Sequence, residues 1–194
     1  MPNARSITPL STDCYMRARH EVYSFTRGGL DRARKLADDS LVLMGENPLL
    51  LVTRGMVSWY RLNFSVDPDE GYLDEAAAYA TRALDQDPQN FFGIFLRGVV
   101  AAKRGELKLA LRDLRKAHEL KPGDSMILGE LNRFMLSAGL EQQDVAWALC
   151  EEHQRIDPLA HRTSTSACKP SRSRLEARVH RPPNGYQEAR LRWP

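Results

Sequence analysis

The stretch FFGIFLRGVVAAKRGELKLALRDLRKAHELKPGD, residues 91–124, predicts two short helices joined by a tight turn. Apolar residues return at helical spacing over residues 91–103, and Arg104-Gly105 then ends the first helix. The second helix begins near Glu106 and ends at Pro122-Gly123. Its apolar stripe consists of Leu107, Ala110, Leu111, Leu114, Ala117 and Leu120, with charged residues on the outer face. The stretch therefore predicts an antiparallel helix pair that repeats every 34 residues.

Small residues stand where such helices would cross closely, and a proline ends the pair. These residues are Gly98, Gly105, Ala110, Ala117 and Pro122. In this pattern the stretch resembles the tetratricopeptide-repeat (TPR) family. The resemblance implies an all-α solenoid of antiparallel helix pairs, in which the first helix of each pair lines a concave groove.

The same period extends over residues 14–158. It predicts about four TPR-like units, at 14–47, 48–90, 91–124 and 125–158, with turn glycines at Gly28, Gly71, Gly105 and Gly139. In the second unit the turn glycine comes nine residues late, after an insertion. Within this insertion Asp67-Pro68-Asp69-Glu70 has the composition of a helix start.

Both flanks differ from the repeats in composition. Residues 1–13 carry two prolines and no apolar period, which predicts a flexible leader or linker, with Thr12 or Asp13 as the first helix cap. Residues 159–194 are rich in Arg, Ser and Pro and are predicted to be a disordered tail. From residue 161 this tail holds eight Lys and Arg against two Glu, whereas residues 1–160 hold 20 basic and 23 acidic residues. The repeat pattern predicts another first helix or a polar capping helix after Pro158, and one hypothesis is that truncation or a shifted reading frame has removed this continuation.

No catalytic, cofactor or metal motif is apparent, so the sequence predicts a protein that is not an enzyme, with no cofactor and no metal site. The three cysteines, Cys14, Cys150 and Cys168, have no paired spacing. No apolar run reaches the length of a membrane span, and the N-terminus lacks the apolar centre of a signal peptide. These features predict a cytoplasmic protein without a membrane association.

The candidate site is the inner face of the first helices. By the TPR resemblance, fixed repeat positions face inward, and here they carry mainly aromatic and apolar side chains. The candidate groove residues are Tyr15, Val22, Phe25, Leu49, Met56, Trp59, Tyr60, Phe92, Phe95, Lys103 and Arg133. Repeats that grip a C-terminal carboxylate present Lys, Asn and Arg there, and Lys103 and Arg133 alone are too few. An amphipathic helix or apolar peptide fits better, with the aromatics as anchors. The alternative is that these side chains pack against one another or against a neighbouring domain.

The predicted function is thus a protein-protein interaction scaffold that binds a protein or peptide partner. More narrowly, LVTRGMVSWYRL followed by an insertion and GYLDEAAAYATRALDQDPQN resembles the degenerate repeats of bacterial signalling kinases, nucleotide cyclases and transcriptional regulators. This resemblance implies a regulatory or docking module. Two alternatives stay open: a self-associating structural module that forms homo-oligomers, and a protein that associates with nucleic acid through its basic tail. A basic stripe on the second helix of the third unit is better explained as a solvated helix face than as a phosphate site, because Asp113 and Glu119 interleave with its basic residues.

Overall fold

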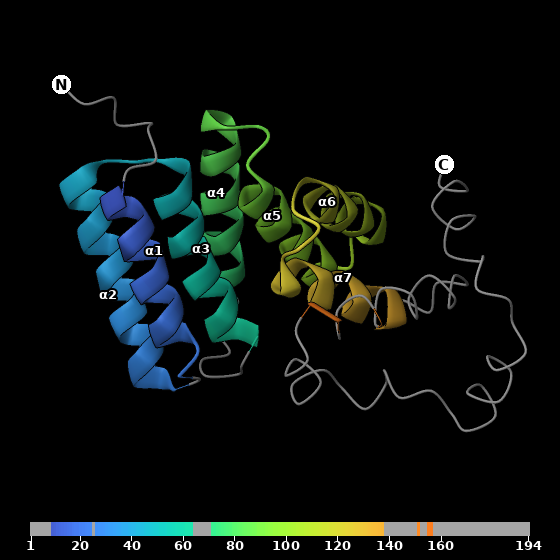
Figure 1. The fold of residues 1–194 in the computed structure, drawn as a ribbon, viewed down its shortest axis with the longest axis horizontal. Helices are drawn as coiled ribbons and strands as arrows, with labels where there is room; N and C mark the ends of the chain where they lie inside the picture. The colour runs from blue at the N-terminus through green and yellow to red at the C-terminus, as the bar shows by residue number, and fades with distance from the viewer. Residues whose placement is uncertain (1–8, 25, 64–70, 138–150, 152–154, 157–194) are drawn as a thin grey trace, which may run out of the picture. The chain divides into compact units, whose positions relative to one another are not determined.

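A computed structural model describes residues 9–24, 26–63, 71–137, 151 and 155–156 of the chain. Within these residues the structure is all-α and holds no strand (Figure 1). The seven helices are α1 (Pro9–Val22), α2 (Arg27–Met44), α3 (Pro48–Asn63), α4 (Gly71–Gln86), α5 (Phe91–Lys103), α6 (Leu107–Leu120) and α7 (Ser125–Ser137). The predicted all-α fold is confirmed.

The chain divides into two compact units, residues 1–120 and 121–194. In the first unit α1 packs on α2, α3 on α4, and α5 on α6, and each pair also packs on the next through α2 with α3 and α4 with α5 (Figure 1). The first helices also meet directly, α1 with α3 and α3 with α5. This is the antiparallel helix-pair arrangement that the 34-residue period predicts.

Polar side chains fix where these helices begin. The Thr26 hydroxyl accepts a hydrogen bond from the backbone N–H of Gly29 at 3.1 Å, and the Asn90 side chain accepts one from Gly93 at 3.0 Å. Asn47 accepts a bond from the N–H of Leu50 at 3.1 Å, directly before a helix whose first residue is a proline. Each cap satisfies a backbone donor that has no partner within its helix.

The turns agree with the prediction in the third unit and differ from it in the first. Helix α5 has the predicted bounds, and α6 follows after Gly105, whose φ of 75° lies in the left-handed region that glycine adopts without strain. By contrast, Gly28 is not the turn glycine, because α2 already begins at Arg27. The first turn comes earlier in the chain, and it ends at Thr26, which caps α2.

Helix α1 begins at Pro9, inside the segment predicted as a leader, so neither Thr12 nor Asp13 is its cap. A proline is well tolerated in the first turn of a helix because its missing N–H would have no intrahelical partner there. The two prolines of residues 1–13 indicate a linker by composition, yet one of them opens the helix. The predicted helix start at residues 67–70 lies outside the described residues.

The second unit is described through α7 and three later residues. Asp124 caps α7, because its carboxylate accepts a hydrogen bond from the backbone N–H of Ile127 at 3.2 Å. The predicted second helix of this repeat and the tail at residues 159–194 lie almost entirely outside the described residues. The four repeat boundaries therefore stay predictions.

Candidate binding face

The structure places the predicted groove residues at different depths. Val22, Met56, Trp59 and Phe95 are buried, whereas Tyr15, Leu49, Tyr60 and Phe92 are half-buried and Lys103 is exposed. Phe25 lies outside the described residues. Arg133 lies on α7 in the second unit, where it is exposed and pairs with Glu130. The residues that remain accessible in the first unit are thus a subset of the predicted ones.

Aromatic contacts connect the three first helices. Trp59 of α3 meets Phe95 of α5 edge-on, with ring centroids 6.4 Å apart, and Trp59 also lies 4.9 Å from Tyr60. Tyr15 of α1 reaches Phe92 of α5, with ring centroids 5.4 Å apart. These pairs have the tilted or edge-on geometry that aromatic rings favour. We call the surface that carries Tyr15, Leu49, Tyr60 and Phe92 the first-helix face.

A buried donor lies beneath this face. The indole Nε1 of Trp59 is buried, and within the described residues it has no hydrogen-bond acceptor. A buried N–H without an acceptor costs about 1–3 kcal/mol. Such a group is uncommon in folded proteins.

Two residues of the first-helix face were not among the predicted ones. Arg19 and Tyr23 follow Tyr15 at steps of four residues, so they continue its stripe to the residue just after the end of α1. The Arg19 guanidinium donates a hydrogen bond to the Tyr15 hydroxyl at 3.5 Å and lies 5.4 Å from the centroid of the Tyr23 ring. The opposite flank of α1 faces α2, because Glu21 there pairs with Arg32. The helical spacing from Tyr15 could have identified both residues.

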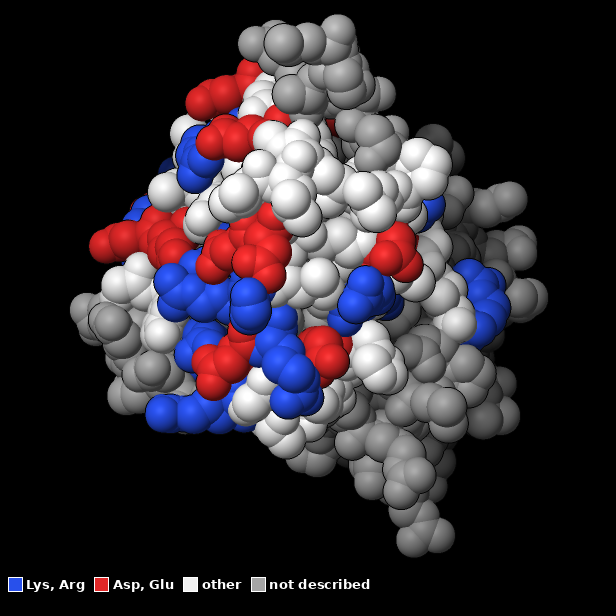
Figure 2. All heavy atoms as spheres, turned by 90° about the vertical axis from the view of Figure 1, so that its left-hand side faces the viewer, with Lys and Arg blue, Asp and Glu red and all other residues white. Residues whose placement is uncertain are grey.

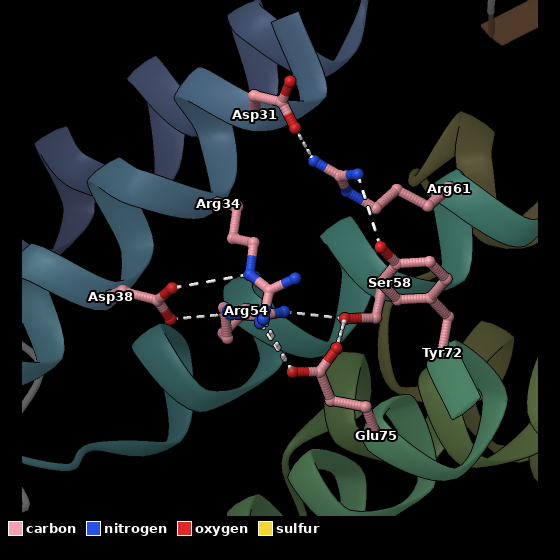
Figure 3. A network of polar contacts seen from close by, with 8 residues as sticks. All are labelled: Asp31, Arg34, Asp38, Arg54, Ser58, Arg61, Tyr72 and Glu75. Atoms are coloured by element: carbon pink, nitrogen blue, oxygen red, sulfur yellow. Dashed lines mark hydrogen bonds and ion pairs between the residues drawn. The ribbon is translucent and has the colours of Figure 1, made fainter. Parts of the chain in front are cut away.

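A buried ionic network ties α3 to its neighbours on both sides (Figure 3). The side chain of Arg54 is only 2% exposed, and it donates to Asp38 of α2 at 2.7 Å and to Glu75 of α4 at 2.6 Å. It also donates to Ser58 at 2.7 Å, and Ser58 donates to the other Glu75 oxygen at 2.7 Å. The Arg34 guanidinium lies within 3.7 Å of Asp38 and 3.6 Å of Glu75. The sequence prediction missed this network.

Two further arginines of the first helices form ion pairs with carboxylates of second helices. Arg61 of α3 pairs with Asp31 of α2 and donates to the Tyr72 hydroxyl at 3.5 Å (Figure 3). Arg97 of α5 pairs with Asp113 of α6, which is itself buried. The buried charges are thus compensated, as burial of an ion requires.

The outer surface of the first pair is a mixture of both signs. Figure 2 shows the side of the molecule on which α1 and α2 lie, with acidic and basic side chains interspersed over it. Exposed pairs such as Lys35 with Asp39, at 2.8 Å, contribute to this mixture. It does not form the one-signed patch that binding of a nucleic-acid backbone requires.

Among the residues that the structure describes, no three His, Cys, Asp or Glu lie together so as to hold a metal ion. In the same part of the chain, no helix has both the length and the apolar character needed to cross a membrane.

Comparison with known proteins identifies the fold. No protein-family model matches the chain, and no curated protein matches it. Among solved structures it is similar to TTC0263, a thermophilic TPR protein of Thermus thermophilus, at 17% identity and a TM-score of 0.57, over 85% of this chain and 82% of that one. Weaker likenesses are to YrrB, a TPR protein with an unusual peptide-binding site (19% identity, TM-score 0.46, 84% of each chain), and to MamA 41-end from Desulfovibrio magneticus RS-1 (18%, 0.49, 79% and 78%). The helix pairs and the likeness to TTC0263 together show that this chain has the TPR fold.

Proposed function

We propose that the chain is a protein-protein interaction scaffold whose first-helix face binds a segment of a partner protein. The observation that carries this proposal is the set of half-buried rings, Tyr15, Tyr60 and Phe92, above the buried Trp59 and Phe95. Rigid aromatic side chains with part of their surface open are the residues that most often anchor a protein interface.

The finer role follows from the sequence resemblance. A docking or regulatory module of a bacterial signalling system needs a face that holds a partner without chemistry of its own. The contacts of the described polar side chains agree with this role, because Arg54, Arg61 and Arg97 pair with carboxylates on neighbouring helices and so hold the helices together.

The experiment is a selection of peptides from a random library displayed on phage, with the full-length chain as the immobilised target. Enriched peptides are synthesised with a fluorescent label, and their Kd is measured by fluorescence anisotropy. We expect Phe92→Ala and Tyr60→Ala to raise Kd about tenfold, the effect of removing one anchor residue worth about 1.4 kcal/mol.

Leu107→Ala is the matched control, because Leu107 is a half-exposed apolar residue on a second helix. Circular dichroism melts of each variant establish that it is folded at the temperature of the binding assay. Equal loss of affinity in Leu107→Ala, or unchanged affinity in both aromatic variants, would contradict the proposed face.

Self-association is the second candidate, and the exposed end of α2 favours it. Val42 and Leu43 are 85% and 83% exposed, which is unusual for two consecutive large apolar residues. A second copy of the chain is the occupant we propose for this surface. Light scattering at several concentrations should then show a mass that rises towards that of a dimer, and Val42→Glu should keep the chain monomeric. A constant monomer mass of the unaltered chain excludes this candidate.

A further inference from the structure

The first helices carry an excess of cations, and this excess is not fully compensated. Helices α3 and α5 contain no Asp or Glu, and the two carboxylates of α1 are already paired, Asp13 with Arg17 and Glu21 with Arg32. The buried Arg54 and Arg61 of α3 and the part-exposed Arg97 of α5 pair with carboxylates of the second helices. No carboxylate of the first helices is therefore left for any other cation on this side.

Arg19 is such a cation. Among the described residues it contacts no carboxylate, and its polar partners are the neutral rings of Tyr15 and Tyr23. Its guanidinium is held between them, four residues from each along the same helix face. Lys103, at the end of α5, is exposed and likewise has no carboxylate partner within the described part of the chain.

The position of Arg19 places this charge beside the aromatic anchors. Tyr15 contacts both the Arg19 guanidinium and the Phe92 ring, so one tyrosine joins the cation to the aromatic part of the first-helix face. A half-buried guanidinium has lost part of its hydration, and a partner carboxylate can compensate for the lost water contacts with charge-assisted hydrogen bonds. The fixed planar fork of arginine favours a carboxylate in this role.

We propose that the segment bound on the first-helix face is an acidic amphipathic one, and that Arg19 pairs with an internal Asp or Glu side chain of the partner. Apolar residues of the segment contact Phe92 and Tyr60, and the acidic residue lies against α1 between Tyr15 and Tyr23. Lys103, the last residue of α5, adds a second, solvent-exposed positive charge. This inference rests on the proposed function, because it names the chemistry of the partner at the same face.

The test repeats the peptide selection with three targets: the unaltered full-length chain, Arg19→Gln and Arg19→Glu. With the unaltered chain we expect an Asp or Glu at one fixed distance from the apolar positions of the enriched peptides. Selection on Arg19→Gln should lose this preference, and selection on Arg19→Glu should replace it with Lys or Arg. For a peptide enriched by the unaltered chain, Arg19→Gln should raise Kd about tenfold.

Arg17→Gln is the matched control, since Arg17 lies on the same helix but is exposed and pairs with Asp13. It should leave both the peptide preference and Kd unchanged. Peptides are made with a free and with an amidated C-terminus, and equal affinity of the two forms assigns the effect to the internal side chain. Loss of binding on amidation would overturn the assignment to an internal residue.

The results that would overturn this inference differ from those that would overturn the proposed function. Peptides that depend on Phe92 but show no acidic position, or that bind Arg19→Gln as tightly as the unaltered chain, overturn this inference and leave the proposed face intact. If no enriched peptide depends on Phe92 or Tyr60, the proposed function and this inference both fail.

Discussion

Removing the carboxylates around Arg54 should cost far more together than the two losses add up to separately. Asp38 and Glu75 each hold one side of a guanidinium that is only 2% exposed. When one carboxylate is removed, the other still compensates the buried charge. When both are removed, only the Ser58 hydroxyl remains as an acceptor. A cation buried without a carboxylate is among the most destabilising features that a mutation can create.

The expected losses of unfolding free energy follow from how exposed each carboxylate is. The Asp38 side chain is 45% exposed, so its pair is largely screened by water, and Asp38→Ala should cost about 1 kcal/mol. Glu75 is 28% exposed and also accepts a bond from Ser58, so Glu75→Ala should cost about 2 kcal/mol. The double variant should lose about 5 kcal/mol of unfolding free energy, the upper end for a broken buried pair. The expected coupling is thus about 2 kcal/mol.

Urea denaturation followed by circular dichroism measures these free energies. A triple variant that adds Arg54→Met removes the buried charge itself, and it should recover most of the stability lost by the double variant. Lys35→Ala, which breaks an exposed pair on α2, is the control and should leave the urea midpoint unchanged. Additive single losses, or a triple variant no more stable than the double one, would refute the view that Arg54 is a compensated buried ion.

Three other changes test the packing, the turn and the buried thiol. Gly55→Ala should cost about 1–3 kcal/mol of unfolding free energy, despite the better helix propensity of alanine. The reason is that the added Cβ would lie 2.5 Å from Leu96 Cδ2 and 2.9 Å from Tyr79 Cβ. A urea titration in which the variant is as stable as the unaltered chain would show that the helices can separate there. Gly105→Ala should cost about 1–2 kcal/mol for a different reason, since nothing lies within 4 Å of a Cβ there but the φ of +75° disfavours any side chain, and Gly105→Asn should recover part of the loss in the same titration. Burial raises the pKa of the Cys14 thiol above its ordinary value, against a smaller lowering by the Ser40 hydroxyl. The unfolded chain loses this proton more readily, so the thiol's contribution to the free energy of unfolding is present below about pH 8.5 and is lost as the pH rises above it. The urea midpoint should therefore fall more steeply with alkaline pH in the unaltered chain than in Cys14→Ala. Parallel slopes of the two chains would contradict this.

Local signals made the third helix pair predictable. The apolar spacing of residues 91–103, the turn at Gly105 and the proline at 122 all lie within one 34-residue stretch, and the structure has α5 at the predicted bounds. The start of α1 was less accessible to such reasoning, because a proline is compatible both with a linker and with the first turn of a helix. Only the packing of α1 on α2 decides between them.

The buried network could not be predicted from local spacing. Asp38 and Glu75 stand 16 and 21 residues from Arg54 and lie on two different helices, so their meeting depends on how three helices pack. A signal was nevertheless present, because a single arginine inside the apolar run LLLVTRGMV indicates a helix buried on every side that also carries a charge.

The kinds of side chain near the first-helix face could be predicted from the sequence, but how deeply each one is buried could not. The TPR resemblance named Trp59, Phe95 and Phe92 alike, yet the first two are buried and the third is half-buried. Repeat positions give the direction of a side chain, whereas exposure depends on how closely α1, α3 and α5 approach one another. Arg19 was missed because it is not at one of the fixed repeat positions that the TPR resemblance turns inward.

The Arg54 network also has a consequence for how the first unit unfolds. Stacked helix pairs can fray from an end, because each pair contacts only its neighbours. Here one guanidinium on α3 is bound by carboxylates from the preceding pair, through Asp38, and from its own pair, through Glu75. Opening of α1 and α2 would remove Asp38, one of the two carboxylates that compensate the buried charge of Arg54, and this raises the free energy of that partial opening. Arg54 therefore couples the first two pairs, together with the Arg61–Asp31 pair, and backbone amides in α2 and α4 should exchange with solvent as one cooperative unit.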